Sequence, residues 1–453
     1  MNPFRSSKHF TKSRAGELTL IFLFGLAPIL WFRENRLLNT EDFVPPPSWE
    51  EYIRFWHVWN DQLGTGALHI LDSGRFPTLF IASFLQQLGV SIVPAQMAQF
   101  VFWFMFPGFA MFYLMGGVYR GANAALARLA AVLFYMFNLW LISNWLGYKE
   151  PLLAAVAIMP ILLGIWVRVF AADSGYRRAI LISGLVSLLG SPIGNNVSEM
   201  LVSLIPVPLL FLTVLLQNSW RRQWPSVRRI LTAAVALLGL LLFLHAFWIV
   251  PEVVGVRSAI AANTFPDFQQ LSSEFLEGQS LNTSITNNIR FVSDWTWYQG
   301  LVDPYRSYAA AFTGSRLLEI MGWTIFGLVL LGAIFGKGRN KVYFILMLVM
   351  GIVAGAGLNS PLGTAYAWAF DNVPFFWIMR SPWFKFTFLT VIGYSVLLGL
   401  SAPILCRVFE KALRSVLRAL PSRTVSRATF SVTLAVFMVV GPIYAYPHTL
   451  GLS

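Results

Sequence analysis

Residues 229–250 read RILTAAVALLGLLLFLHAFWIV, and this stretch decides the fold class. Apart from Arg229 at its start, no Lys, Arg, Asp or Glu interrupts it. An apolar run of about 20 residues is what a helix needs to cross the hydrocarbon core of a bilayer. A spanning segment must also pair its backbone polar groups internally, which a helix does. The stretch therefore predicts a transmembrane helix.

The whole chain repeats this pattern. Its 453 residues are 57% hydrophobic and 12% charged, with a mean hydropathy of +0.64, unlike a soluble domain. The sequence predicts an all-α, polytopic transmembrane bundle, with 1–453 forming a single transmembrane domain. We expect about eleven spans, at 17–33, 97–117, 128–146, 152–170, 179–193, 199–217, 229–250, 316–335, 342–358, 384–405 and 429–446.

The distribution of basic residues predicts the orientation. Lys and Arg number 33 against 20 acidic residues, and they fall in short loops on one side of the predicted spans. This pattern is typical of cytoplasmic loops and does not indicate nucleic-acid binding. We expect a multi-pass protein of the plasma (inner) membrane with a cytoplasmic N-terminus and an extracytoplasmic C-terminus. The segment 406–428 is expected to be a basic amphipathic helix on the inner leaflet.

The first external loop, 34–96, concentrates the acidic residues. Six of the 20 carboxylates lie between Asn35 and Pro77, at Glu41, Asp42, Glu50, Glu51, Asp61 and Asp72. The apolar segment that ends this loop, 77–93, is short and predicts a re-entrant or interfacial helix. The loop is the first place to search for a working acid.

Two of these acids are the best catalytic candidates. Asp42 precedes Pro45-Pro46-Pro47, which stiffens the backbone above the first span, so that its carboxylate could act as a general base on a hydroxyl. Asp61 lies beside Trp59 and a glycine-rich turn, and could serve as a second acid or bind sugar. A solvated loop carboxylate is the alternative for each. Paired acids could also hold Mg²⁺ or Ca²⁺, although nothing requires a metal.

A second constellation predicts a phosphate site. Arg380 and Lys385 lie in MRSPWFK, at the expected external end of a span. Two cations held by a proline and aromatic residues suit the phosphate of a lipid-linked donor. Snorkelling of both side chains to the headgroups is the alternative. Glu199, at the outer end of another span, is a functional candidate or a helix cap.

Other features indicate less. The long external segment 251–315 is rich in Asn, Ser, Thr and Trp, which is typical both of sugar sites and of aromatic belts. His245 is expected to be a satisfied histidine inside the bundle. Cys406, the single cysteine, excludes an intrachain disulfide. The sequence has no P-loop, HExxH, GxSxG or CxxC, which disfavours an ATPase, a zinc protease and a serine hydrolase.

These motifs together resemble the GT-C superfamily of membrane glycosyltransferases, in particular its arabinofuranosyltransferase-like branch. The resemblance rests on the first loop around Asp42 and Asp61, on FWIVP at 247–251 and on RSPWFKF at 380–386. It implies a polyprenyl-phosphate sugar donor and inverting transfer to a glycan or cell-envelope acceptor outside. Asp42 takes the place of the catalytic acid, with Asp61 in reserve, and Arg380 and Lys385 match the positions expected to bind the donor phosphate.

The resemblance also raises an expectation about partners. Relatives usually continue into a large extracytoplasmic domain, so we expect a short form or a separate chain that supplies this domain. Two alternatives to a transferase stay open at this point. One is a protein that binds or translocates lipid-linked glycans without chemistry, and the other is a structural subunit of a membrane assembly.

Overall fold

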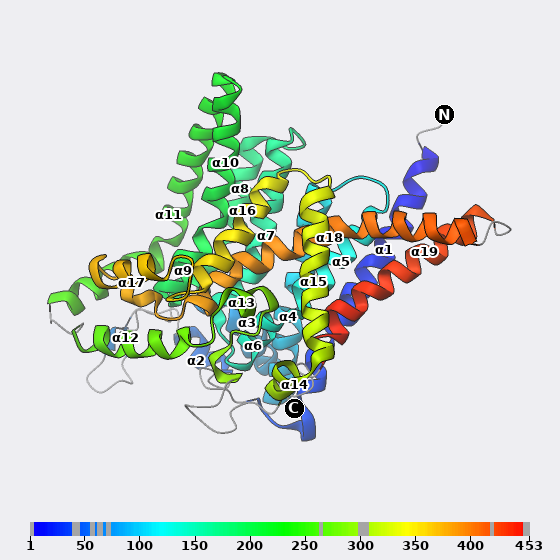
Figure 1. The fold of residues 1–453 in the computed structure, drawn as a ribbon. Coiled ribbons are helices and arrows are strands. Elements are labelled where there is room, and N and C mark those ends of the chain that lie inside the picture. Colours follow the sequence, from blue (N-terminus) through cyan, green and yellow to red (C-terminus); the bar gives the residue numbers. More distant parts are fainter. Residues whose placement is uncertain are drawn as a thin grey trace.

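A computed structural model describes residues 4–38, 46–54, 59–60, 67–68, 74–261, 266–297, 308–416 and 421–446. Helices dominate this part of the chain (Figure 1). Strands β1 (Trp59–Asn60) and β2 (Ala67–Leu68) pair antiparallel, with Trp59 opposite Leu68. The predicted polytopic helical bundle is confirmed.

Eight helical segments in the described residues are long and apolar enough to cross a membrane. They are Arg14–Trp31, Ile92–Val118, Glu150–Phe170, Val197–Trp220, Trp224–Gly255, Arg316–Phe335, Pro382–Val416 and Ser422–Ile443. The helices α5 (Ala124–Phe137) and α6 (Leu139–Leu146) make a ninth if they form one bent span, with an angle of 43° between them. Asn138 lies at the bend and caps α6, since its side chain accepts a hydrogen bond from Leu141 N at 2.9 Å.

Two of the eleven expected spans are shorter than predicted. Helix α16 (Lys341–Gly355) has 15 residues, and α8 (Tyr176–Leu188) has 13 and begins with two arginines. The remaining elements are α1 (Phe4–Gly25), η1 (Ala27–Trp31), η2 (Arg33–Asn35), α2 (Trp49–Arg54), α3 (Phe76–Gln87), α4 (Ile92–Val118), α7 (Glu150–Phe170), η3 (Ser191–Asn195), α9 (Val197–Leu204), α10 (Pro206–Trp220), α11 (Trp224–Ala261), α12 (Pro266–Ser280), α13 (Ile285–Arg290), η4 (Trp295–Trp297), α14 (Ala309–Gly314), α15 (Arg316–Phe335), α17 (Gly363–Asn372), η5 (Phe376–Met379), α18 (Pro382–Val416), α19 (Ser422–Met438) and η6 (Val439–Ile443).

Helix α18 forms the centre of the bundle and packs against α5, α15, α16 and α19 (Figure 1). Its contact with α16 depends on glycines from both helices. A Cβ atom at Gly351 would lie 2.3 Å from Thr390 Oγ1, and one at Gly393 would lie 2.8 Å from Phe344 O. Small residues let helix backbones approach closely, which drives helix association in a bilayer. The two helices therefore hold a fixed register.

Several of the basic loops meet at one end of the bundle, around Arg120, Asp173, Arg339 and Arg407, and we call this end the basic face. Asp173 Oδ2 accepts hydrogen bonds from Arg120 Nη2 at 2.6 Å and from Arg339 Nη1 at 2.5 Å. Three loops that are far apart in sequence therefore meet at one carboxylate. Arg407 of α18 interacts electrostatically with Tyr119 at the same end. This agrees with the placement of these basic loops on one side.

The other end of α18 carries Lys385 in its first turn, and we call the region around this residue the polar face. Lys385 and Arg407 are 22 positions apart in this helix, a rise of about 33 Å. The hydrocarbon core of a bilayer is about 30 Å thick. Helix α18 is thus long enough to connect the two charged regions across a bilayer.

Segments outside the core are more helical than the sequence suggested. The helix that contains the span expected at 229–250 is longer than this span, because α11 continues through Pro251 to Ala261. The described parts of 251–315 include α12, α13 and α14. The basic segment after 406 begins as a direct continuation of α18 to Val416. Proline fits inside these helices because surrounding groups can satisfy the freed carbonyl.

Candidate functional site on the polar face

The first turn of α18 carries a buried cation. The side chain of Lys385 is only 6% exposed, and its Nζ donates a hydrogen bond to Ile378 O of η5 at 3.0 Å. This bond folds η5 back onto α18, just across the Ser381-Pro382 corner. Lys385 interacts electrostatically with Glu199, Arg380 and Lys149. The structure thus brings together the three polar-face residues Glu199, Arg380 and Lys385 that the sequence had singled out.

Glu199 supplies the negative charge of this cluster. It lies in the first turn of α9, which packs against both α18 and η5, and it is 7% exposed. Asn196, rather than Glu199, caps this helix, because Asn196 Oδ1 accepts hydrogen bonds from Ser198 N and Glu199 N. A buried carboxylate is costly without a nearby cation. Glu199 and Lys385 therefore stabilise each other's charge.

Arg380 lies at the outer edge of the cluster. Its side chain is exposed, and Nη1 is 3.4 Å from Ser272 Oγ of α12. The guanidinium also lies over the ring of Phe275, 5.2 Å from its centroid, a cation–π distance. Both contacts come from the segment 251–315, so this segment positions the cation. The site therefore has two positive groups that differ in exposure, the exposed guanidinium of Arg380 and the buried ammonium of Lys385.

A buried ion pair holds residues 74–75, at the end of the acidic stretch between Asn35 and Pro77, close by. Arg75 donates to Glu150 through Nε at 2.9 Å and through Nη2 at 2.8 Å, a bidentate pair. Gly74 O accepts a hydrogen bond from Ser191 Oγ of η3 at 2.8 Å. Since η3 leads into α9 and Glu150 follows Lys149, the loop ends beside the Glu199–Lys385 cluster.

Sequence reasoning missed Arg75, Lys149 and Glu150. The signal was present, because Lys149 and Glu150 are adjacent charges between two apolar runs and precede Pro151. In the sequence, GYKEP at 147–151 has the appearance of a short turn between the spans expected at 128–146 and 152–170. A charged pair that opens a span belongs among functional candidates, since such residues are costly near a membrane.

The two catalytic candidates, Asp42 and Asp61, lie outside the described residues, and Trp59 is described only as part of β1. The flanks of Asp42 are anchored on both sides. Leu38 exchanges two backbone-to-side-chain hydrogen bonds with Gln96 of α4, at 2.9 and 2.8 Å. Pro47 O accepts from Ser83 Oγ and Gln86 Nε2 of α3.

The described acids do not form a metal centre. Among the residues that the structure describes, no group of three or more His, Cys, Asp or Glu side chains could hold a metal ion. The Mg²⁺ or Ca²⁺ suggested for paired acids of the first loop remains a prediction.

Near the cluster, burial raises the pKa of Tyr148 far above its ordinary value, and the nearby Glu150 adds to this effect. The phenol therefore keeps its proton and serves as a hydrogen-bonding group.

His245 is a structural residue. Trp248 Nε1 donates to His245 Nδ1 at 2.8 Å, so the proton of the neutral ring lies on Nε2. That nitrogen is 2.9 Å from Ser187 Oγ, which donates to Gly184 O at 2.6 Å. A histidine that donates to a serine cannot take its proton. The prediction of a satisfied histidine is confirmed.

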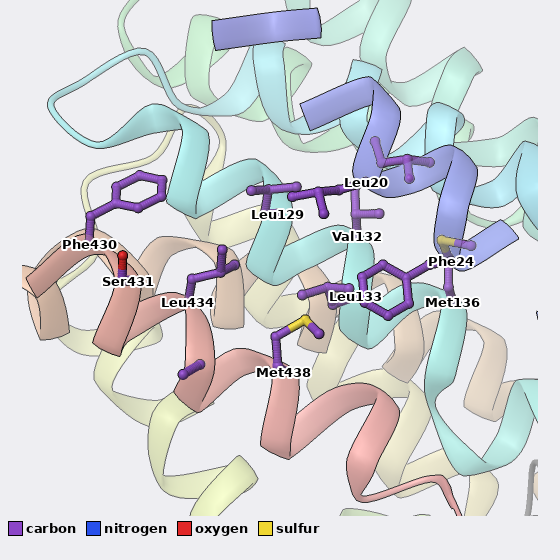
Figure 2. Close-up of a pocket in the computed structure, with 12 residues that line it drawn as sticks. Leu20, Phe24, Leu129, Val132, Leu133, Met136, Phe430, Ser431, Leu434 and Met438 are labelled. Atoms are coloured by element: carbon purple, nitrogen blue, oxygen red, sulfur yellow. The ribbon is translucent and has the colours of Figure 1, made fainter. Parts of the chain in front are cut away.

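An apolar groove of about 320 Å³ opens elsewhere, between α1, α5 and α19 (Figure 2). Figure 2 shows Phe24, Leu133, Leu434 and Met438 around it, with Ser431 at one side. None of its lining residues belongs to the polar-face cluster. Its lining suits hydrocarbon chains and offers no chemistry.

Comparisons with known proteins link the chain to a solved structure. No protein-family model matches the chain, and no curated protein matches it. Among solved structures, the chain is similar to a cryo-EM structure of a mutant of arabinofuranosyltransferase AftD from mycobacteria. The TM-score is 0.44 at 14% sequence identity, and the match covers 94% of this chain. The chain spans 27% of the length of that protein.

Proposed function

We propose that the protein is a membrane glycosyltransferase that transfers a sugar from a polyprenyl-phosphate donor to a glycan or cell-envelope acceptor at the polar face. The observation that carries the proposal is the buried ammonium of Lys385, which lies beside Glu199 and the exposed Arg380. A cation kept in a low-dielectric site needs a functional or structural reason, because its desolvation is expensive. Binding the phosphodiester monoanion of the donor, and stabilising the phosphate dianion that forms when the sugar leaves it, would provide one.

The two cations have complementary roles in this proposal. Arg380, exposed and positioned by Ser272 and Phe275, captures the donor phosphate as it reaches the membrane surface. Lys385 then stabilises the charge that grows on the phosphate as the glycosidic bond breaks. Electrostatic stabilisation of a leaving group is strongest where water is excluded. Glu199 keeps Lys385 protonated and positioned.

The acceptor is activated by an acid of the first loop. The carboxylate of Asp42 takes the proton of an acceptor hydroxyl, whose oxygen attacks the anomeric carbon of the sugar. The bond from that carbon to the phosphate oxygen breaks, and polyprenyl phosphate leaves with the electron pair. One displacement of this kind inverts the anomeric configuration. Asp61 is the second candidate for the base, and Trp59 for stacking on sugar.

The test is sugar transfer by the purified protein in lipid nanodiscs, with a panel of polyprenyl-phosphate sugars. Asp42→Asn is expected to lower turnover by about 10²- to 10⁴-fold with donor binding kept, as for loss of a general base. Glu50→Gln is the matched control, because Glu50 belongs to the same loop but is exposed and pairs with Arg54. Equal turnover of the wild type and Asp42→Asn would contradict the assigned base.

Two other functions predict different results in this assay. A protein that binds or translocates lipid-linked glycans would bind the donor and show no turnover in any variant. A structural subunit would bind no donor at all, or would do so only with its partner chain. Donor binding measured beside turnover therefore separates the three functions.

A further inference from the structure

The basic face contains a charged cavity, which has no part in the proposed transfer. Its volume is about 530 Å³, and four cationic side chains line it, those of Arg120, Lys337, Arg339 and Arg407. They come from the end of α4, from the loop between α15 and α16, and from α18. Tertiary structure, not local sequence, thus collects these cations.

The cations exceed the carboxylates that the structure places beside them. Arg120 and Arg339 share one oxygen of Asp173. In the described part of the chain, Lys337 and Arg407 make no ion pair, and Glu410 on the next turn of α18 pairs with Arg414. The cavity thus has four cationic side chains and one neighbouring carboxylate, Asp173, and this excess of positive charge raises the local concentration of anions.

The cavity is also shaped by close packing, so it is a fixed feature. Arg339 N donates to Val118 O at 2.9 Å, which ties the loop 336–340 to the end of α4. A Cβ atom at Gly336, which lines the cavity, would lie 2.2 Å from Gly332 O, so a larger residue there would displace the backbone of this loop. Leu400, Pro403 and Ile404 give the cavity an apolar wall below the cations.

We propose that this cavity binds a phosphate group, with the apolar wall receiving the less polar part of an amphiphilic ligand. Arginine guanidinium groups match phosphate oxygens in fork geometry, and lysine adds a point charge. Basic pockets between transmembrane helices are suited to anionic lipid headgroups. The phosphate could belong to such a headgroup or to a soluble molecule, and the experiment distinguishes these sources.

The experiment measures lipid retention by native mass spectrometry on the full chain in detergent, with added phosphatidylglycerol or phosphatidylcholine. We expect the wild type to retain phosphatidylglycerol, and Lys337→Gln/Arg407→Gln to lower its apparent affinity by about tenfold or more, since two charge-assisted contacts are lost. The matched control is Arg221→Gln/Arg228→Gln, which removes two exposed charges of the α10–α11 region, away from the cavity lining.

Inorganic phosphate added as competitor identifies the source. Displacement of phosphatidylglycerol at millimolar phosphate would support a site that soluble phosphates also occupy, whereas retention would support a lipid headgroup. The proposal is overturned if the cavity variant and the control lose phosphatidylglycerol equally, or if neither differs from the wild type. It is also overturned if the wild type retains phosphatidylcholine equally well. None of these results depends on sugar transfer.

Discussion

The polar face and the basic face both concentrate cations, but they do so in opposite ways. On the polar face Lys385 is buried and each cation has a defined contact, with Ile378 O for Lys385 and with Ser272 and Phe275 for Arg380. On the basic face the cations are more exposed and exceed the single carboxylate of Asp173. The polar face holds a buried cation in a defined position, whereas the basic face attracts anions through an excess of positive charge.

This difference predicts how substitutions on each face affect stability and binding. A buried charge costs several kcal/mol to desolvate and acts at full strength on a neighbouring ligand. An exposed charge costs little and is screened by salt. Substitutions on the polar face should therefore have large effects on both stability and chemistry, and those on the basic face should have smaller effects that depend on ionic strength.

The largest effect is expected from the buried pair Arg75–Glu150. Glu150→Gln leaves the Arg75 guanidinium, 17% exposed, without its bidentate partner. Breaking one partner of a buried pair costs about 3–5 kcal/mol. Denaturant or thermal unfolding in detergent micelles should show this loss, and Asp173→Asn on the basic face should be much less destabilising. Similar losses in both variants would remove the contrast between the faces.

The next effect concerns the two polar-face cations in sugar transfer. Lys385→Gln is expected to lower kcat/KM by about 100-fold and Arg380→Gln by about tenfold, because a buried charge acts through a lower dielectric than an exposed one. Arg316→Gln, which removes an exposed charge at the start of α15, is the control. If Arg380→Gln proved the more damaging, phosphate capture at the surface would limit the reaction, and Lys385 would be a structural residue.

Much of this contrast was accessible from the sequence. Apolar runs located the long spans, and the basic loops predicted which ends meet at one face. Arg380 and Lys385 were chosen together from one motif and Glu199 was chosen separately, each as a charge at the end of a span, and the three meet in space. Charges at span ends are informative because the bilayer confines them to two thin surfaces.

The sequence was silent on tertiary pairing. Nothing local in GRFP or GYKEP reveals that Arg75 and Glu150, 75 positions apart, form a bidentate pair. Burial singles out Lys385 over Arg380, and this burial depends on how α9 and η5 pack on α18, which the sequence does not show. Pro251 suggested a helix end because proline removes a hydrogen bond, yet α11 continues through it.

Ionic strength should separate the faces next. Raising salt from about 50 to 500 mM shortens the Debye length from about 14 to about 4 Å. Phosphatidylglycerol affinity at the basic face is expected to fall by about fivefold. The kcat of sugar transfer at the polar face is expected to change less than twofold, because Lys385, which stabilises the leaving phosphate, is buried. Equal salt dependence of kcat and of phosphatidylglycerol affinity would show that both sites act by screened attraction alone.

The smallest effect sharpens the role of Asp173. Asp173→Asn removes the one carboxylate that Arg120 and Arg339 share, so phosphatidylglycerol affinity is expected to rise about two- to threefold.

The hydrogen bond from Arg339 and the charge of Arg120 hold the pKa of Asp173 below its ordinary value, and Arg168 is a further neighbouring cation. A depressed carboxyl pKa adds stability above the unfolded pKa, which is lost as the pH falls through the folded value. Asp173 therefore stays ionised between pH 5 and 8, and wild-type affinity for this phosphodiester should not vary across that range. A rise in wild-type affinity at pH 5 to the level of the variant would mean that Asp173 is protonated there, against the ion pairs that hold its charge.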